Sequence, residues 1–163
     1  MSPAPGSMID PRGPRFVAAV TTVVLAVVLV TASVWLLAAQ TVVFALAAFG
    51  GLQRNPYSVV YRRLIRPRLS PPTELEASAP PRFAQGVGFA FALFGTVALA
   101  FGATTLGLIA VGLALAAAFL NAAFGFCLGC EMYLLGRRIL RPRSLETSSP
   151  MTNLSPNNKE VAA

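Results

Sequence analysis

The residues of this sequence best suited to chemistry are its two cysteines, Cys127 and Cys130, which form a C-x-x-C pair. Thiols at this spacing can exchange between a dithiol and a disulfide, and they can transfer sulfur as a persulfide. A soft ion such as Cu(I) can bind to so few thiolates, whereas a closed zinc site needs four ligands, and the chain has no histidine. The pair can also be two small core residues without reactivity. Redox or sulfur chemistry is the leading interpretation, and the other two remain open.

The cysteines lie at the end of one of two long runs without a charged residue, residues 16–53 and 83–130. The chain is 55% hydrophobic and 12% charged, whereas a soluble domain usually carries about 25% charged residues. A globule of 163 residues cannot bury so much apolar chain. This composition excludes a soluble enzyme, a nucleic-acid-binding domain and a disordered protein. We therefore expect an all-α integral membrane protein in contact with the lipid bilayer.

Each uncharged run is long enough for two membrane spans. A bilayer core of about 30 Å is crossed by about 20 helical residues, so each run must fold back once. We expect the turns near Thr31-Ala32-Ser33 and near Gly102-Ala103-Thr104. The four expected transmembrane helices are then close to residues 16–31, 34–52, 84–102 and 105–130.

All 13 Lys and Arg residues fall on one side of such a bundle, because the two turns between paired helices carry none. The positive-inside rule makes this side cytoplasmic, together with both termini. The expected organisation is a Pro-rich N-terminal tail without regular helix (1–15), a first transmembrane hairpin (16–53), a basic cytoplasmic loop (54–82), a second hairpin with the C-x-x-C pair (83–130), a basic juxtamembrane segment (131–143) and a disordered tail (144–163).

The two hairpins show signs of a duplication. The segments 48–50 and 62–68, which read AFG and RRLIRPR, recur in the same register as AFG at 123–125 and RRILRPR at 137–143. Each unit contains two spans, so both units have the same topology and are related by an axis along the membrane normal. This favours a fold of two tandem helical hairpins, a parallel pseudo-repeat.

The register of the repeat places Cys130 opposite Asn55, so we expect Arg54 and Asn55 to lie beside the cysteines at the cytoplasmic mouth. Their donors could stabilise a thiolate. Glu131 opposes a thiolate, and so does the expected position of the pair near the C-terminal end of the fourth helix. The candidate site is therefore Cys127 and Cys130 as a redox pair, with Arg54, Asn55 and Glu131 as residues that tune it. No cofactor is expected, and a metal, if one binds, would be held by the two cysteines.

Three motifs in the chain carry a resemblance to a known family. They are IDPRGPRF at 9–16, GLQRNPY at 51–57 and GFCLGCE at 125–131. Together they resemble an uncharacterised bacterial family of multi-pass membrane proteins, the domain-of-unknown-function family 4395, over about residues 8–140. The resemblance implies the bacterial cytoplasmic membrane and an association with thioredoxin-like or rhodanese-like sulfur proteins. It carries over no catalytic residue.

The leading function is thus a membrane component that handles thiol redox or sulfur at the cytoplasmic face through Cys127 and Cys130. In a reducing cytoplasm, the resting pair should be a dithiol. The alternatives are a structural or assembly membrane protein without chemistry and a membrane protein that binds a soft metal such as copper. We do not expect a stand-alone enzyme, and a homo-oligomer stays open.

Overall fold

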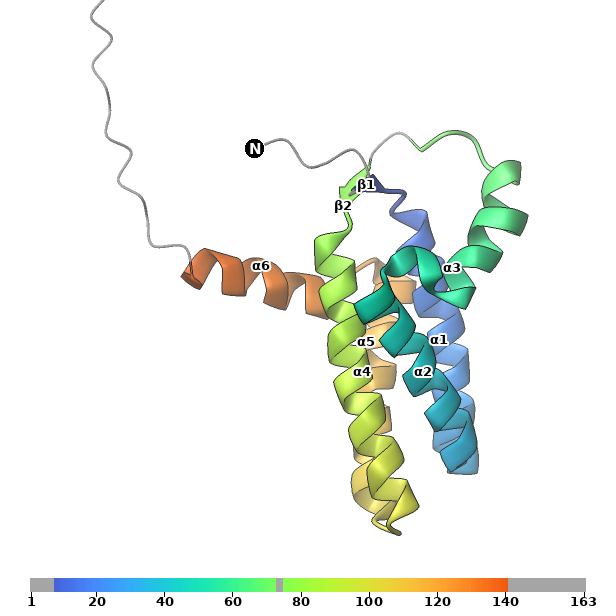
Figure 1. Ribbon diagram of the computed structural model, residues 1–163, viewed down its shortest axis with the longest axis vertical. Coiled ribbons are helices and arrows are strands. Elements are labelled where there is room, and N and C mark those ends of the chain that lie inside the picture. Colours follow the sequence, from blue (N-terminus) through green and yellow to red (C-terminus); the bar gives the residue numbers. More distant parts are fainter. Residues whose placement is uncertain (1–7, 73–74, 141–163) are drawn as a thin grey trace, which may run out of the picture.

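The computed structural model describes residues 8–72 and 75–140 of the chain, and this part is predominantly helical (Figure 1). Four helices run alongside one another: α1 (Arg12–Thr31), α2 (Val34–Gly50), α4 (Ala79–Ala100) and α5 (Thr104–Phe124). A sixth helix, α6 (Leu128–Leu140), leaves the bundle sideways at one end. At that same end lie the elements that connect α2 to α4.

The connection between α2 and α4 is built from short elements. After α2 come a 3-10 turn η1 (Leu52–Arg54), the helix α3 (Pro56–Val60), a π-helical turn η2 (Tyr61–Ile65) and a second 3-10 turn η3 (Arg66–Arg68). Two short strands, β1 (Met8–Ile9) and β2 (Glu76–Ala77), pair antiparallel with Met8 opposite Ala77. The strand pair ties the segment before α1 to the segment before α4.

Both tight turns lie where the sequence predicts them. Ala32 has a left-handed backbone (φ 48°) and donates its N–H to Val28 O, which ends α1. Ser33 begins α2, because its Oγ accepts a hydrogen bond from the Leu36 N–H. The second turn follows α4 and passes through Gly102 at φ 81° before α5 begins. Each uncharged run therefore forms two adjacent helices.

The bundle is held by contacts between the two helix pairs as well as within them. α2 packs along α4, α1 packs along α5, and α4 packs along α5. Small residues on α4 allow close approach: a Cβ added at Gly88 would lie 2.8 Å from the Phe44 ring. Between α2 and α4 the hydroxyls of Thr41 and Thr96 lie 3.1 Å apart. The buried core is formed by Leu25, Val28, Leu37, Phe44, Ala92, Val111 and Ala114.

Two helices begin earlier than expected. α1 starts at Arg12 rather than at residue 16, and α4 starts at Ala79 rather than at residue 84. The prediction that residues 1–15 contain no regular helix is therefore wrong for residues 12–15. The reason is that Pro14 and Pro80 lie in first turns, where a missing N–H breaks no helical hydrogen bond.

The fourth long helix ends earlier than expected. α5 ends at Phe124 instead of near residue 130, because Gly125 takes a left-handed backbone (φ 70°) and donates its N–H to Asn121 O. A glycine in this conformation is a common helix C-terminus. The expected basic segment 131–143 is helical as far as Leu140 and belongs to α6. The cysteines therefore lie at the junction of two helices rather than inside one.

The helices of the described chain have the character of membrane spans. Three of them, α1, α4 and α5, are long and apolar enough to cross a membrane, while α2 is a shorter apolar helix of 17 residues. Large apolar side chains such as Val30, Trp35 and Phe101 are more than four-fifths exposed. Such an outward-facing apolar surface is compatible with contact to lipid.

Candidate functional site

The two cysteines occupy the start of α6. Cys127 O accepts the Glu131 N–H at 3.1 Å, which makes Cys127 the N-cap of the helix and places Cys130 in its first turn. The two residues form a disulfide, and their Cα atoms are 5.1 Å apart, within the usual range of about 4.4–6.8 Å. The backbone at this junction is thus compatible with a disulfide, and the resting dithiol predicted from the sequence stays a prediction.

The electrostatic environment predicted for the cysteine pair is wrong. The sequence placed the cysteines near the C-terminal end of a helix, where the dipole opposes a thiolate, but they lie at the N-terminus of α6. At a helix N-terminus the free N–H groups and the dipole favour negative charge and activate a cysteine. Glu131 lies exposed in the first turn, where its charge stabilises the helix but disfavours a thiolate.

Two glycines hold the junction in place. A Cβ added at Gly129 would lie 2.6 Å from both the Cα and the Cβ of Ala84, so α6 rests directly on the backbone of α4. On the other side, the Arg15 guanidinium packs on Gly125, because a Cβ there would lie 3.6 Å from Arg15 Cζ. Arg15 thus brings a positive charge to the loop that carries Cys127, which the sequence did not indicate.

The first motif, residues 9–16, packs against the π-helical turn η2. Asp10 Oδ1 accepts the Arg12 N–H at 3.0 Å, and Asp10 Oδ2 accepts the Tyr61 hydroxyl at 3.3 Å. Tyr61 is 4% exposed and packs its ring on Gly13 and on Phe16. Burial of the phenol and the neighbouring Asp10 carboxylate raise the pKa of Tyr61, so the phenol stays protonated and remains a donor to Asp10.

The second motif turns the chain from α2 into α3. Gly51 takes φ 91°, and Asn55 caps α3 by accepting the Tyr57 N–H at 2.8 Å on its Oδ1. The Tyr57 hydroxyl donates to Gln40 Oε1 at 2.8 Å, which ties α3 back to α2. Burial raises the pKa of the Tyr57 phenol as well.

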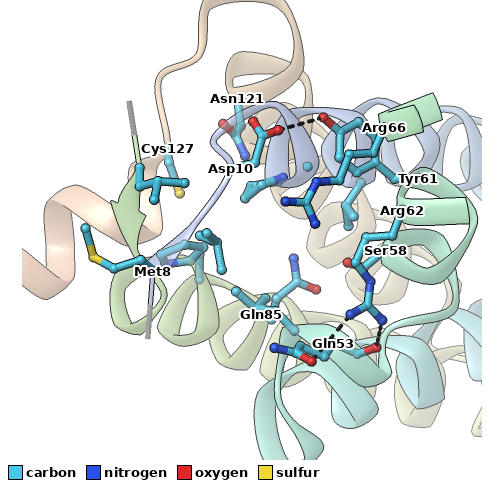
Figure 2. A pocket seen from close by; sticks show the side chains of 18 residues that line it. Met8, Asp10, Gln53, Ser58, Tyr61, Arg62, Arg66, Gln85, Asn121 and Cys127 are labelled. Atoms are coloured by element: carbon cyan, nitrogen blue, oxygen red, sulfur yellow. Dashed lines mark hydrogen bonds between the residues drawn. The ribbon is translucent and has the colours of Figure 1, made fainter. Parts of the chain in front are cut away.

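All three motifs meet around one cavity of about 320 Å³, which we name the basic cavity. Figure 2 shows its lining, with Asp10 hydrogen-bonded to Tyr61 and Arg62 reaching Gln53. Arg62 Nη2 donates to Gln53 O at 2.8 Å. The lining residues from the motifs are Ile9, Asp10, Gly13 and Pro14 from the first, Leu52 and Gln53 from the second, and Cys127 from the third.

Other polar side chains of the basic cavity were not predicted as site residues from the sequence. Arg62 and Arg66 line it together with Tyr61, and Gln85 and Asn121 line it from α4 and α5. Gln85 could have been detected in the sequence, because Gln85 and Asn121 are the two residues with a side-chain amide in the uncharged run 83–130. No pattern in the sequence indicated the hydrogen bond between Tyr61 and Asp10.

Of the predicted site residues, Cys127 is the one that lines the basic cavity. Cys130 is bonded to it and half-buried. Arg54 is exposed and packs its stem against Gly50, while Asn55 is fully buried at the start of α3. Neither of these two lines the basic cavity. Within residues 8–72 and 75–140, no group of three or more His, Cys, Asp and Glu residues could hold a metal ion.

The motifs also agree with a known family. Residues 9–138 match the family described as a domain of unknown function (DUF4395), a range that contains all three motifs. The chain belongs to the DUF4395 family. The family predicted from the sequence is thereby confirmed. No curated protein and no solved structure matches the chain. In this DUF4395 member, the matched range begins within β1 and ends within α6, and it therefore includes the cysteine junction and every lining residue of the basic cavity except Met8.

Proposed function

We propose that this protein is a four-span membrane protein that exchanges electrons between thiols and disulfides through Cys127 and Cys130 at the cytoplasmic face. The observation that carries the proposal is the position of the pair. The two sulfurs are joined at the N-terminus of a helix, and Cys127 lines a cavity to which all three motifs contribute. A helix N-terminus and a neighbouring arginine favour the thiolate that such exchange requires.

The exchange step follows from this position. A thiolate of a partner attacks the Cys127 sulfur, which breaks the intramolecular bond and releases Cys130 as a thiolate. The partner's second thiolate then attacks the mixed disulfide, which closes the partner's own disulfide and releases Cys127. The partner loses two electrons and two protons, and the pair gains them. A thioredoxin-like protein with two cysteines fits this role, as does a rhodanese-like sulfur protein that offers two thiols, and the step is reversible.

The four-span topology is supported by the length of α2 and by the position of the arginines. The 17 residues of α2 extend about 26 Å, at the lower limit for a bilayer core. The C-terminal end of α2 is capped by Arg82, whose Nε donates to Ala48 O at 2.7 Å and whose Nη2 donates to Phe49 O at 3.0 Å. The segments with the described arginines lie at the end of the bundle that bears α3 and α6, opposite the two tight turns (Figure 1).

The tandem repeat is supported by matching helix ends. The repeat aligns Gly50 with Gly125. α2 ends at Gly50, and α5 ends at Phe124, one residue before Gly125. In each unit a glycine with positive φ follows, Gly51 in the first and Gly125 in the second, before a further helical segment begins.

The topology can be tested with reporter fusions. We expect a fusion at Ser70 to report the cytoplasmic side of a bacterial cytoplasmic membrane and a fusion at Thr104 to report the opposite side, because the positive charges keep their end inside. An alkaline phosphatase and a fluorescent protein at each position give complementary signals. If both positions report the same side, α4 does not cross the membrane and the four-span arrangement is wrong.

Arg15 and Arg54 are the two candidates for stabilising a thiolate at Cys127. Arg15 packs on the loop that carries the cysteine, whereas Arg54 packs on Gly50. We expect Arg15→Gln to slow alkylation of the reduced Cys127 at neutral pH by about threefold to tenfold, because a nearby cation favours the thiolate. Arg54→Gln should have a smaller effect.

The alkylation experiment uses Cys130→Ser protein in lipid nanodiscs, so that Cys127 alone reacts, and it follows the rate across a pH series. Equal rates for the parent and for Arg15→Gln would exclude Arg15 as a tuning residue. A larger effect of Arg54→Gln would instead favour the position expected from the repeat. A Cys127 that stays unreactive at every pH would favour two packed cysteines without chemistry.

A further inference from the structure

A second cavity meets the cysteine junction from inside the bundle. It has a volume of about 400 Å³, and we name it the bundle cavity. Its walls come from α1, α2, α4, α5 and the start of α6, and they are almost entirely apolar. It shares four lining residues with the basic cavity, namely Ala84, Gln85, Asn121 and Cys127. Cys127 therefore borders both the basic cavity, which has several polar side chains, and the almost entirely apolar bundle cavity.

The bundle cavity lies where α4 and α5 separate. Farther from the cysteines the two helices touch, because a Cβ at Gly107 would lie 3.1 Å from Gly95 O. At the other end, α6 closes on α4 at Gly129. Between these contacts the rim is formed by side chains that are 37–56% exposed: Phe91, Leu113, Leu128 and Met132. Since this outer surface is apolar, an apolar molecule could enter from the lipid.

The inner end of the bundle cavity is its polar end. Gln85 Oε1 is buried and has no hydrogen-bond partner among the described residues. A buried acceptor without a partner is costly, so a donor from a ligand would stabilise it. Asn121 lies at the same end and offers an amide donor. Figure 2 shows Gln85, Asn121 and Cys127 in the lining of the basic cavity, so this polar end is the one that the two cavities share. A ligand that fits has an apolar tail and a head with oxygen atoms beside the sulfur.

We propose that the bundle cavity binds an isoprenoid quinone, which accepts electrons from the reduced cysteine pair. This inference rests on the proposed function, because it names the oxidant that regenerates the disulfide. Cys127 and Cys130 lose two electrons and two protons and form the S–S bond, and the two quinone carbonyls become the hydroxyls of a hydroquinone. Asn121 donates to a quinone carbonyl, and Gln85 Oε1 accepts from a hydroquinone hydroxyl.

The test uses the full chain in lipid nanodiscs, reduced and then freed of reductant without oxygen. Decyl-ubiquinone is the probe, and its absorbance and the number of free thiols are followed together. We expect one quinone to be reduced for each pair of thiols lost. Ala117→Phe fills the bundle cavity from α5, and the matched control Ala123→Phe lies on the exposed side of the same helix outside it.

Ala117→Phe should slow oxidation by the quinone by about tenfold or more, because an added ring occupies the space of the ligand. Glutathione disulfide should oxidise Ala117→Phe as fast as it oxidises the parent. The quinone should oxidise Ala123→Phe as fast as it oxidises the parent. Gln85→Met keeps the volume of the side chain and removes its amide, and it should also slow the quinone reaction.

The outcomes separate the two proposals. If glutathione disulfide oxidises the pair but decyl-ubiquinone does not, the quinone site is wrong and thiol exchange stands. If the quinone oxidises the pair at an unchanged rate in both Ala117→Phe and Gln85→Met, the reaction does not use the bundle cavity, and the inference is overturned. If neither oxidant closes the disulfide, both proposals fail.

Discussion

Gly129→Ala should detach α6 from α4 and destabilise the protein by about 1–3 kcal/mol, the usual effect of overpacking. The added Cβ would lie 2.6 Å from Ala84 Cα and Cβ, and a backbone atom cannot move aside as the end of a flexible side chain can. Because Cys127 and Cys130 stand at the start of this helix, its detachment should also alter the rate at which the reduced thiols are alkylated. Thermal unfolding in detergent and thiol alkylation measure the two effects.

Gly136→Ala is the matched control for this substitution. It lies on the same helix, and a Cβ there would meet no atom within 4 Å. Alanine also favours the helix over glycine by about 1 kcal/mol, so this variant should be as stable as the parent or slightly more so. Equal destabilisation by both substitutions would mean that α6 does not rest on α4 at Gly129.

Tyr61→Ala should destabilise the end of the bundle that bears α3 and α6 by about 3–5 kcal/mol, as truncation of a buried aromatic ring usually does. Tyr61 is almost fully buried, packs on Gly13 and Phe16, and holds Asp10 through its hydroxyl. Tyr61→Phe keeps the ring and removes the hydrogen bond, so it should cost only about 1 kcal/mol. Thermal unfolding of both variants in the same detergent gives the comparison.

The control for Tyr61 is Leu64→Ala, in the same π-helical turn. Leu64 is exposed, so its truncation should change stability by less than about 0.5 kcal/mol. If Tyr61→Ala unfolds no earlier than Leu64→Ala, the first motif is not anchored on η2, and the basic cavity does not have the described lining.

The helices could be predicted from the sequence better than their ends. Two uncharged runs and the small or polar residues within them were enough to place both tight turns. The end of α5 was missed because residues on both sides of Gly125 are apolar, so the uncharged run does not reveal the left-handed glycine at which the helix ends. The start at Arg12 was missed because proline was taken to exclude a helix, although a first turn tolerates it, and the start at Ala79 was missed because the span was placed inside the uncharged run that begins at residue 83.

The candidate site could be predicted only in part. The spacing of Cys127 and Cys130 was visible in the sequence, whereas their place at a helix N-terminus depended on the end of α5. The repeat pointed to Arg54 and Asn55, and their tuning role stays a prediction. The contact between Asp10 and Tyr61 joins residues far apart in the sequence, and a single sequence holds no pattern for such a pair.

The central claim is that Cys127 and Cys130 act as one redox couple, and a redox titration in the membrane tests it most directly. The full chain in nanodiscs is equilibrated in a series of glutathione buffers, quenched with acid, and labelled with a maleimide that adds mass at each free thiol. We expect molecules with either two free thiols or none, exchanging in one two-electron transition in which about 30 mV changes the ratio tenfold. A pair that stays reduced in every buffer, or a predominance of molecules with one free thiol, would contradict the claim.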